Sequence, residues 1–591
     1  MQENIDELIA ASLSRIQQIE KELWPDEKNC CEPSPLPNPL PHTGEGVLED
    51  YQAAFRQLEK LIASNGDDQR HEFIIVIPVA DRPQHLKSCL DSLLALCRLF
   101  GYGGYSDGRF QKVSVIIADD SKDADNIANH KIIANECSKQ GLTTLYFGLD
   151  EQLDQMDLLS EAAKQALSRV LGNTNMEAFY HKGPSIMRNI AYLELNKIRS
   201  ENENVLFYFI DSDQEFQLKV STPAGDKNLY ACNYFYYLDQ IFTHTNASML
   251  TGKVVGDPPV SPAVMAGNFL EDVICFLNQI AAYDPTLTCQ FHSSRQQDND
   301  DASYHDMAAL FGFKSSNASC QYHCSIQGEH NNASCFQHFS NELSRFFYGE
   351  HPTRKTYYQH EDILASVRPA RTVYTGNYIF KPAALQYFVP FAPLKLRMAG
   401  PVLGRLIKAE LRDGFVSANL PMLHKRTVRE TGQSEFRPGI AADTATIDLS
   451  GEFERQFFGD VMLFSIEKLI AMGYPRQALS NEIITQVVAA THANMLQQYY
   501  DKRLLITAKL NTLNKLFREK SHWWNQSAEH AEAANNFRVF MTNIEQNFGD
   551  ESAGYRLINS PANKAKRHAG IIEGIAGYAE DRLSWAEMLA K

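Results

Sequence analysis

Two carboxylates separated by one small residue, in the triplet Asp211-Ser212-Asp213, directly follow an apolar run at residues 205–210. Oxygen ligands of this kind suit a hard divalent cation such as Mg²⁺ or Mn²⁺, which usually takes one or two carboxylates together with phosphates. The apolar run predicts a strand buried on both faces, and ligands bind beyond the C-terminal ends of strands in open α/β sheets. The alternative interpretation is an acidic turn that binds nothing.

Three other segments place charged residues at comparable points of the chain. The segment PVADR, with Pro78 and Asp81, lies at the end of one apolar run, and Asp119 and Asp120 end a second. The segment HKGPSIMRNIAYLEL places Arg188 in a helix just before the 205–210 run. The sequence therefore predicts polar side chains at several neighbouring strand ends.

Strands and helices alternate through this region, which predicts a mostly parallel sheet with helices on both faces. We expect strands at residues 73–79, 113–118, 143–148 and 205–210, and helices at 83–100 and 184–199. Leu86, Leu90, Leu93 and Cys97 recur at helical spacing in the first of these helices.

In this order and spacing the four segments resemble the donor-binding half of GT-A fold glycosyltransferases, in particular the family 2 group of nucleotide-sugar-dependent transferases. The signature of that group is a strand ending in IPV-x-[DNE]-R, a strand ending in DD-S, a G-x-x-x-x-R-N helix and a strand ending in D-x-D. All four occur here within residues 74–213, and a weaker likeness continues over residues 371–426. The resemblance implies a GT-A fold, which is Rossmann-like, and transfer of a sugar from a UDP- or GDP-sugar to a glycan, lipid-linked or small-molecule acceptor.

The resemblance also implies roles for individual residues. Asp213 would bind Mn²⁺ or Mg²⁺ directly, Asp211 would reach the metal through water and contact the ribose or sugar, and His424 would complete the metal shell. Lys425 and Arg426 would add to the stabilisation of the leaving diphosphate. The expected donor-binding residues are Pro78, Asp81, Asp119, Asp120, Arg188, Asp211 and Lys253.

The general base that an inverting transferase needs is missing from its usual place. The family 2 group takes it from an acidic motif before an L-G-R-L helix, where this chain reads Arg397-Met398-Ala399-Gly400. Either the base lies elsewhere, with Glu361, Asp362, Asp257 and Asp272 as candidates, or the enzyme retains the anomeric configuration. Both alternatives stay open.

Residues 289–350 are polar and rich in His, Asn, Ser and Gln, which indicates an insertion or long loop, or a lid over the site. Within it, Cys320, Cys324, Cys335 and His338 have spacings close to those of a small structural zinc site, and His323 and His330 are nearby.

Length and composition limit the remaining possibilities. At 591 residues, two to four domains are expected, and 44% hydrophobic with 22% charged residues is ordinary for a globular protein. The net charge of −16 argues against nucleic acid or an anionic membrane as main partner. No apolar run approaches the length of a transmembrane helix, and the first residues lack the pattern of a secretion signal, so we expect a cytoplasmic protein.

We expect three parts along the chain. Residues 1–70 form an N-terminal helical segment with a Pro-rich linker, and residues 71–445 form the catalytic domain. The latter has a donor half at 71–280 and an acceptor half at 360–430. Residues 450–591 form a C-terminal helical domain, in which apolar residues recur at helical spacing near 482–519 and either pack in a core or form a homo-oligomer.

Two other functions remain as alternatives. A sugar-nucleotide nucleotidyltransferase also uses a nucleotide-binding sheet and Mg²⁺, but it would need a glycine-rich phosphate loop where this chain reads PVADRPQHL. A non-catalytic binding protein of the same fold would explain the missing carboxylate before the L-G-R-L helix.

Overall fold

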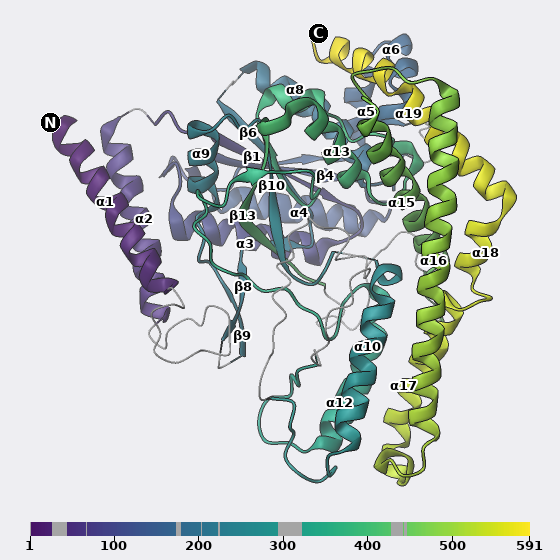
Figure 1. Cartoon of the computed structure of the whole chain (residues 1–591). Helices are drawn as coiled ribbons and strands as arrows, with labels where there is room; N and C mark the ends of the chain where they lie inside the picture. The colour runs from purple at the N-terminus through teal and green to yellow at the C-terminus, as the bar shows by residue number, and fades with distance from the viewer. Residues whose placement is uncertain are drawn as a thin grey trace.

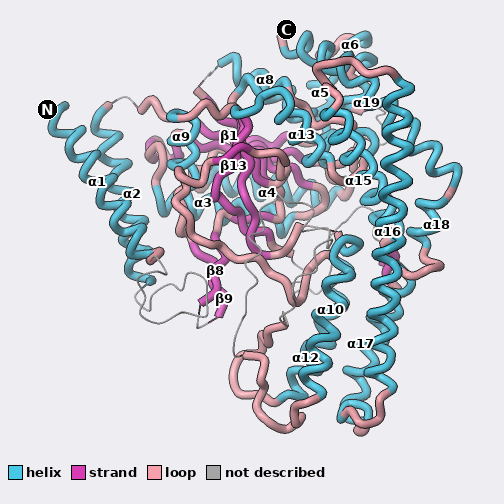
Figure 2. Tube along the Cα trace, viewed as in Figure 1, coloured by secondary structure: helices cyan, strands magenta, loops and turns pink. Residues whose placement is uncertain are grey.

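The computed structural model describes residues 2–25, 44–66, 68–172, 179–201, 204–222, 225–259, 261–292, 322–426, 441–442 and 446–590. Within them, the centre of the molecule is a nine-stranded sheet with helices on both faces (Figures 1 and 2). The strands lie in the order β11-β13-β10-β12-β6-β1-β4-β5, and β7 pairs with β13. Their bounds are β1 Glu72–Val79, β4 Val113–Asp119, β5 Thr144–Phe147, β6 Val205–Ile210, β7 Gln214–Glu215, β10 Met249–Gly256, β11 Arg368–Pro369, β12 Asn377–Phe380 and β13 Phe415–His424.

The longer strands of this sheet share one direction, with β12 as the exception. β1 is parallel to β4 and β6, β4 is parallel to β5, and β10 is parallel to β13. Because β12 is antiparallel to both β6 and β10, these two strands also point the same way. The C-terminal ends of β1, β4, β5, β6, β10 and β13 therefore lie along one edge, where open α/β sheets bind their ligands.

Side chains of β1 alternate between two apolar clusters, because successive residues of a strand point to opposite faces. Ile74 and Val76 belong to one cluster, whereas Phe73, Ile75 and Ile77 belong to the other. Both faces are buried, which explains why the strand is a continuous apolar run in the sequence.

Different helices cover the two faces of the sheet. The face that holds Phe73 and Ile75 packs against α1 to α4 and α9, and the face that holds Ile74 packs against α5, α7, α8, α10, α12 and α13. The bounds are α1 Gln2–Leu23, α2 Gly44–Asn65, α3 Pro83–Phe100, α4 Ala124–Lys139, α5 Leu149–Asp157, α6 Glu161–Ala166, α7 Ser168–Leu171, α8 Pro184–Glu201, α9 Tyr234–His244, α10 Pro262–Ala281, α12 Asn332–Glu342 and α13 Ala399–Leu411.

The chain from Ser450 onward is helical and packs on the same side as α10 (Figure 1). The apolar residues that recur along α16 are buried against α10, α15, α17 and α19, as their spacing predicts. These helices share one apolar cluster with a face of the sheet. Their bounds are α15 Ser450–Ala471, α16 Asn481–Arg518, α17 Ala531–Phe548, α18 Ala553–Asn559 and α19 Pro561–Leu589.

Short strand pairs and 3-10 turns complete the described structure. The pairs are β2 Tyr105–Ser106 with β3 Arg109–Phe110, β8 Leu218–Thr222 with β9 Gly225–Leu229, and β14 Ala441–Ala442 with β15 Ile447–Asp448. The 3-10 turns are η3 Leu343–Tyr348, η4 Pro382–Gln386, η5 Ala392–Leu394, η6 Arg412–Gly414, η7 Trp523–Asn525 and η8 Ala528–His530.

The predicted mixed α/β architecture with a parallel-rich sheet is confirmed, and each of the four predicted strands is present within a residue of its expected ends. The described part of the polar stretch 289–350 differs from the predicted loop, because residues 332–342 form α12. The Phe336 ring of α12 stacks on Trp524 at 5.4 Å between ring centroids. Within the described residues, no helix has the length and apolarity that a membrane crossing requires.

Candidate functional site

The chain after β6 brings two distant parts of the sheet edge together. It turns through residues 211–213, and β7 then pairs with the last residues of β13, so that Gln214 lies opposite His424. The Lys425 backbone N–H donates to the Asp213 carbonyl oxygen at 3.0 Å. Asp213 is therefore held at the end of β13, although β10 and β12 separate β13 from the strand that precedes Asp213.

Asp213 lies in a cationic environment. Its Oδ2 accepts hydrogen bonds from Arg82 at 3.2 Å and from Arg426 at 2.9 Å, and its side chain is only 6% exposed. Burial opposes ionisation of Asp213, but the neighbouring His424 and Arg426 hold its pKa well below the usual range. Guanidinium groups donate several hydrogen bonds in a planar fork, so Arg82 and Arg426 are groups that can also bind an anionic ligand such as a diphosphate.

His424 faces Asp213 with its Nε2. Its Nδ1 donates to the Asp257 carbonyl oxygen at 2.6 Å, and its Nε2 lies 3.5 Å from Asp213 Oδ2. Neighbouring ligands about 2.1 Å from Mg²⁺ are roughly 3 Å apart. A histidine oriented by a carbonyl group and paired with a carboxylate is a metal-ligand arrangement, so the residues present fit the cation that the resemblance implies.

Asp211, the other carboxylate of the triplet, faces away from this pair. It forms an ion pair with the buried Arg188, which also donates to the Thr375 carbonyl oxygen at 3.0 Å. Burial disfavours the charge on Arg188, but Asp211 raises its pKa above the ordinary value. A Cβ on Gly376 would lie 2.7 Å from Gln214 Nε2 and 2.9 Å from Asp211 Oδ2, so a larger residue in the turn before β12 would displace these side chains.

The Asp81 carboxylate is occupied by protein donors. It accepts the backbone N–H groups of Lys122 and Asp123, the Asn126 amide and a bond from His181 Nε2 at 2.6 Å. Burial opposes ionisation, but the His181 bond and the backbone N–H groups lower the pKa of Asp81. Four bonds fill the acceptor capacity of a carboxylate, so in this conformation Asp81 orders the loop after β4.

The two carboxylates after β4 are also engaged. Asp119 accepts bonds from His130 Nδ1 at 2.9 Å and from the Tyr146 hydroxyl at 2.7 Å, and it is 1% exposed. Asp120 accepts from Lys182 Nζ at 2.6 Å and from the Gly183 backbone N–H at 3.0 Å. Asp120 thereby ties β4 to the N-terminal end of α8.

Pro78 and Lys253 complete the expected donor-binding set. Pro78 is partly exposed near the end of β1, in register with Ala118 of β4. Lys253 is partly exposed on β10, beside an irregularity in the pairing with β13.

The structure brings Asp213, His424, Arg82 and Arg426 into contact at the sheet edge.

The four candidate bases differ in their surroundings. Asp257 pairs with Lys355, and Asp272 pairs through both oxygens with Arg354. Glu361 pairs with Arg368, and Asp362 accepts the Ala365 backbone N–H at 2.7 Å. The Glu361 and Asp362 side chains bond within the segment that leads to β11, which pairs with the beginning of β13, whereas Asp213 lies at the end of β13.

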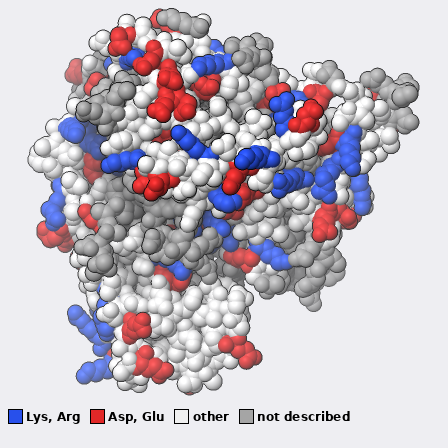
Figure 3. Space-filling model, turned by 180° about the vertical axis from the view of Figure 1, so that it is seen from behind, with Lys and Arg blue, Asp and Glu red and all other residues white. Residues whose placement is uncertain are grey.

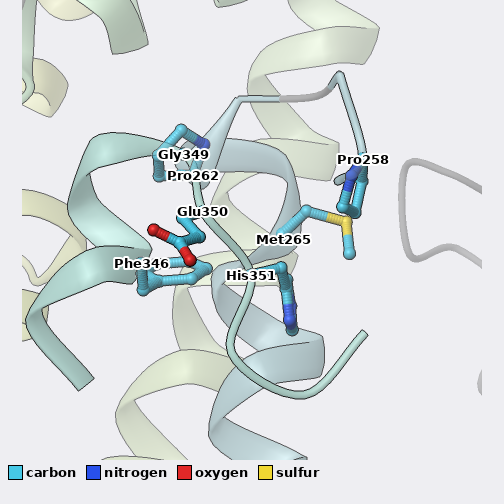
Figure 4. A pocket seen from close by; sticks show the side chains of 7 residues that line it. All are labelled: Pro258, Pro262, Met265, Phe346, Gly349, Glu350 and His351. Carbon is cyan, nitrogen blue, oxygen red and sulfur yellow. The ribbon is translucent and has the colours of Figure 1, made fainter. Parts of the chain in front are cut away.

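One further carboxylate lies near Asp257. A small pocket is lined by Pro258, Pro262, Met265, Phe346, Gly349, Glu350 and His351 (Figure 4). Glu350 is 4% exposed, and its Oε2 makes no hydrogen bond within the described part of the chain. Burial raises the pKa of Glu350, and the nearby Lys355 offsets only part of this effect.

Arg82, which contacts Asp213, and Glu350, which lines the pocket, are two residues to which the sequence analysis gave no role. Arg82 is the last residue of the PVADR segment, and its position next to Asp81 at a strand end could have identified it from the sequence. Glu350 follows Gly349, which has a φ of +82°, and this turn carries no motif.

The predicted cysteine and histidine set is only partly gathered. Cys320 lies outside the described residues, and His338 Nε2 contacts Ser325 Oγ at 3.5 Å. Cys324 lies with Cys289, His292 and His330, a group whose donor atoms are all within 4.8 Å of one another. The predicted Cys335 lies outside this group, but its thiol interacts with the thiols of Cys324 and Cys289.

No family model matches the chain, and no curated protein matches it. Among solved structures, one that matches is a crystal structure of S. aureus TarS 1–349. The match has a TM-score of 0.26 and 11% sequence identity, and it covers 86% of this chain and 91% of that chain. At so low a TM-score, the likeness gives no basis for a functional assignment.

Proposed function

We propose that the protein is a metal-dependent glycosyltransferase of the GT-A type, which moves a sugar from a UDP- or GDP-sugar to an acceptor hydroxyl. The observation that supports this function most is the pairing of Asp213 with His424 at the C-terminal edge of the sheet, with Arg82 and Arg426 beside them. A carboxylate, an imidazole and two guanidinium groups are suited to hold a cation and a diphosphate together.

Each of these residues has a role in the proposed reaction. Asp213 and His424 would hold Mn²⁺ or Mg²⁺, which when bound neutralises the charge that develops on the departing nucleoside diphosphate. Arg82 and Arg426 would donate hydrogen bonds to the phosphate oxygens, and these bonds would become stronger as negative charge accumulates there. Arg188 would position Asp211 toward the ribose or the donor sugar.

Glu350 is our choice for the base that an inverting reaction requires. Its raised pKa and its Oε2, which makes no hydrogen bond in the described structure, are properties of a general base. Arg345 lies 3.7 Å from the other oxygen, Oε1, whereas Asp257 and Asp272 form closer pairs with Lys355 and Arg354. Pro258 of the same pocket follows Asp257, whose carboxylate accepts the Arg426 backbone N–H at 3.0 Å. This bond connects the segment that carries Pro258 to Arg426, which supports Glu350 as the base in the proposed reaction.

Calorimetry with UDP and GDP, each with and without Mn²⁺, tests the proposal. We expect binding of at least one diphosphate that strengthens when Mn²⁺ is present, followed by transfer or slow hydrolysis of the corresponding nucleotide sugar. Binding of a triphosphate with release of pyrophosphate would instead indicate a sugar-nucleotide nucleotidyltransferase. Absence of any nucleotide binding would contradict the proposal and favour a non-catalytic protein.

A further inference from the structure

Four metal-ligating side chains converge at the end of α10 that is remote from the sheet edge. They are Cys289, His292, Cys324 and His330, and one donor atom of each lies within 4.8 Å of all the others. The two cysteines are buried, His330 is half-buried and His292 is exposed. The described loop that carries them lies beside α12 at the lower end of the molecule (Figure 2).

Two separations within the group are close to those of tetrahedral coordination, the nitrogen–sulfur one being shorter by about 0.4 Å. His292 Nε2 and His330 Nε2 are 3.2 Å apart, and Cys324 Sγ is also 3.2 Å from His330 Nε2. Around a tetrahedral zinc ion, two nitrogen ligands lie about 3.3 Å apart, and a nitrogen and a sulfur ligand lie about 3.6 Å apart. A single imidazole nitrogen that faces two donor atoms is explained by one ion between them.

Backbone hydrogen bonds fix the two segments that supply the ligands. The Cys289 N–H donates to the His330 carbonyl oxygen at 2.9 Å, and the Cys324 N–H donates to the Phe291 carbonyl oxygen at 3.1 Å. His330 Nδ1 donates to the Gly328 carbonyl oxygen at 2.9 Å. This last bond orients the ring and leaves Nε2 as a lone-pair donor, as in metal-bound histidines.

We propose that Cys289, His292, Cys324 and His330 bind one zinc ion. Two thiolates and two neutral imidazoles are a known donor set for tetrahedral zinc, and this mixture of sulfur and nitrogen excludes Mg²⁺ and Mn²⁺, which prefer oxygen. The ion balances the charge of two buried thiolates, which would otherwise be costly to bury.

The zinc site is structural and independent of the proposed glycosyl transfer. Four protein ligands leave no open position for a substrate. The site follows the C-terminal end of α10, whereas Pro258 and Asp257 precede the N-terminal end of this helix of 20 residues, which is about 30 Å long. The ion would link Cys289 and His292, which precede residues 293–321, to Cys324 and His330, which follow them.

Metal analysis of the full-length protein, purified without chelators from zinc-supplemented cells, is the direct test. We expect one zinc per chain in the parent, little zinc in Cys289→Ser and Cys324→Ser, and full zinc in Cys275→Ser. The last variant is a matched control, because Cys275 lies on α10 outside the four-residue group. A parent protein without zinc, or equal zinc in all four proteins, would overturn the proposal.

Two measurements keep the test decisive if a cysteine variant folds poorly. His292 is exposed, so His292→Ala should leave the fold intact and release zinc to a chromogenic chelator faster than the parent does. Co²⁺ substituted into the parent should show the intense visible bands of tetrahedral thiolate coordination. Weak octahedral bands, or a thiol titration that reveals a Cys289–Cys324 disulfide, would refute a zinc ion at this place.

Discussion

Asp213 has two arginine partners, and the His424 Nε2 lies 3.5 Å from its Oδ2. The two guanidinium groups can also donate hydrogen bonds to phosphate oxygens, and Asp213 and His424 carry atoms that can bind a cation. In the described structure these side chains pair with one another, and under the proposed function the same groups would hold a metal ion and its bound phosphates.

Asp213→Asn should weaken Mn²⁺-dependent binding of the nucleoside diphosphate by about 100-fold or more, because it removes a charged ligand and its charge-assisted bonds. Calorimetry with and without Mn²⁺ measures this change. Asp91→Asn is a suitable control, since Asp91 is exposed and pairs with Lys87 on α3. Equal losses in the two variants would contradict the assigned role of Asp213.

Glu350→Gln should lower kcat by about 100-fold to 10,000-fold while leaving diphosphate affinity unchanged, as expected for loss of a general base. In the parent, kcat should fall at acid pH with a midpoint above the ordinary glutamate value, because burial raises the pKa of Glu350 and the protonated form cannot accept a proton. Glu361→Gln provides the comparison. A large loss in Glu361→Gln alone would assign the base to that residue, and no loss in either variant would favour a retaining reaction.

At the scale of elements, α15 and α16 enclose a buried carboxylate. Asp460 of α15 accepts the Tyr499 hydroxyl at 2.6 Å and the Gln456 amide at 2.8 Å. Burial raises the pKa of Asp460 to about 7, and burial lowers the pKa of the nearby Lys502 to about 8. The interface between these helices therefore carries a titratable group that is only weakly compensated.

Asp460→Asn should stabilise the protein at alkaline pH by roughly 2 kcal/mol and have less effect at pH about 5. The Asp460 pKa in the folded state, about 7, lies above the unfolded value of about 3.9. The free energy of unfolding of the parent therefore falls as pH rises from about 4 to about 7 and stays at this lower value at higher pH. Denaturant unfolding at both pH values measures the difference. A shift in unfolding free energy that is the same at both would show that Asp460 titrates normally.

Strands buried on both faces were predictable, because β1, β4 and β6 are apolar runs that end at acidic residues. The pairing of β7 with β13 was not, since two-residue strands leave no pattern. The proposed zinc group was missed for a related reason. Cys324 was recognised, but Cys289 and His292 meet it only through backbone bonds between two loops. Glu350 had no motif at all.

At the scale of the whole molecule, the C-terminal helices share a core with the sheet. Phe207 and Phe209 of β6 belong to the same apolar cluster as Phe457, Leu513 and Trp585. Removal of residues 450–591 would therefore uncover a large apolar surface rather than separate two complete cores. On the face seen in Figure 3, by contrast, acidic and basic side chains are interspersed.

A fragment of residues 1–449 should aggregate or bind a hydrophobic dye strongly and should lack cooperative unfolding, because the exposed surface has no other cover. Light scattering and dye fluorescence measure this. Co-expression with residues 450–591 should restore solubility. A monomeric 1–449 fragment that unfolds cooperatively would contradict the shared core.

The contact between the ends of β6 and β13 has a consequence during synthesis. Asp213 is synthesised 211 positions before His424, so the two side chains can meet only after most of the sheet has been made. Under the proposed function, a nascent chain would therefore gain affinity for the nucleotide only late in synthesis, and a translation product that stops before His424 would not bind the donor.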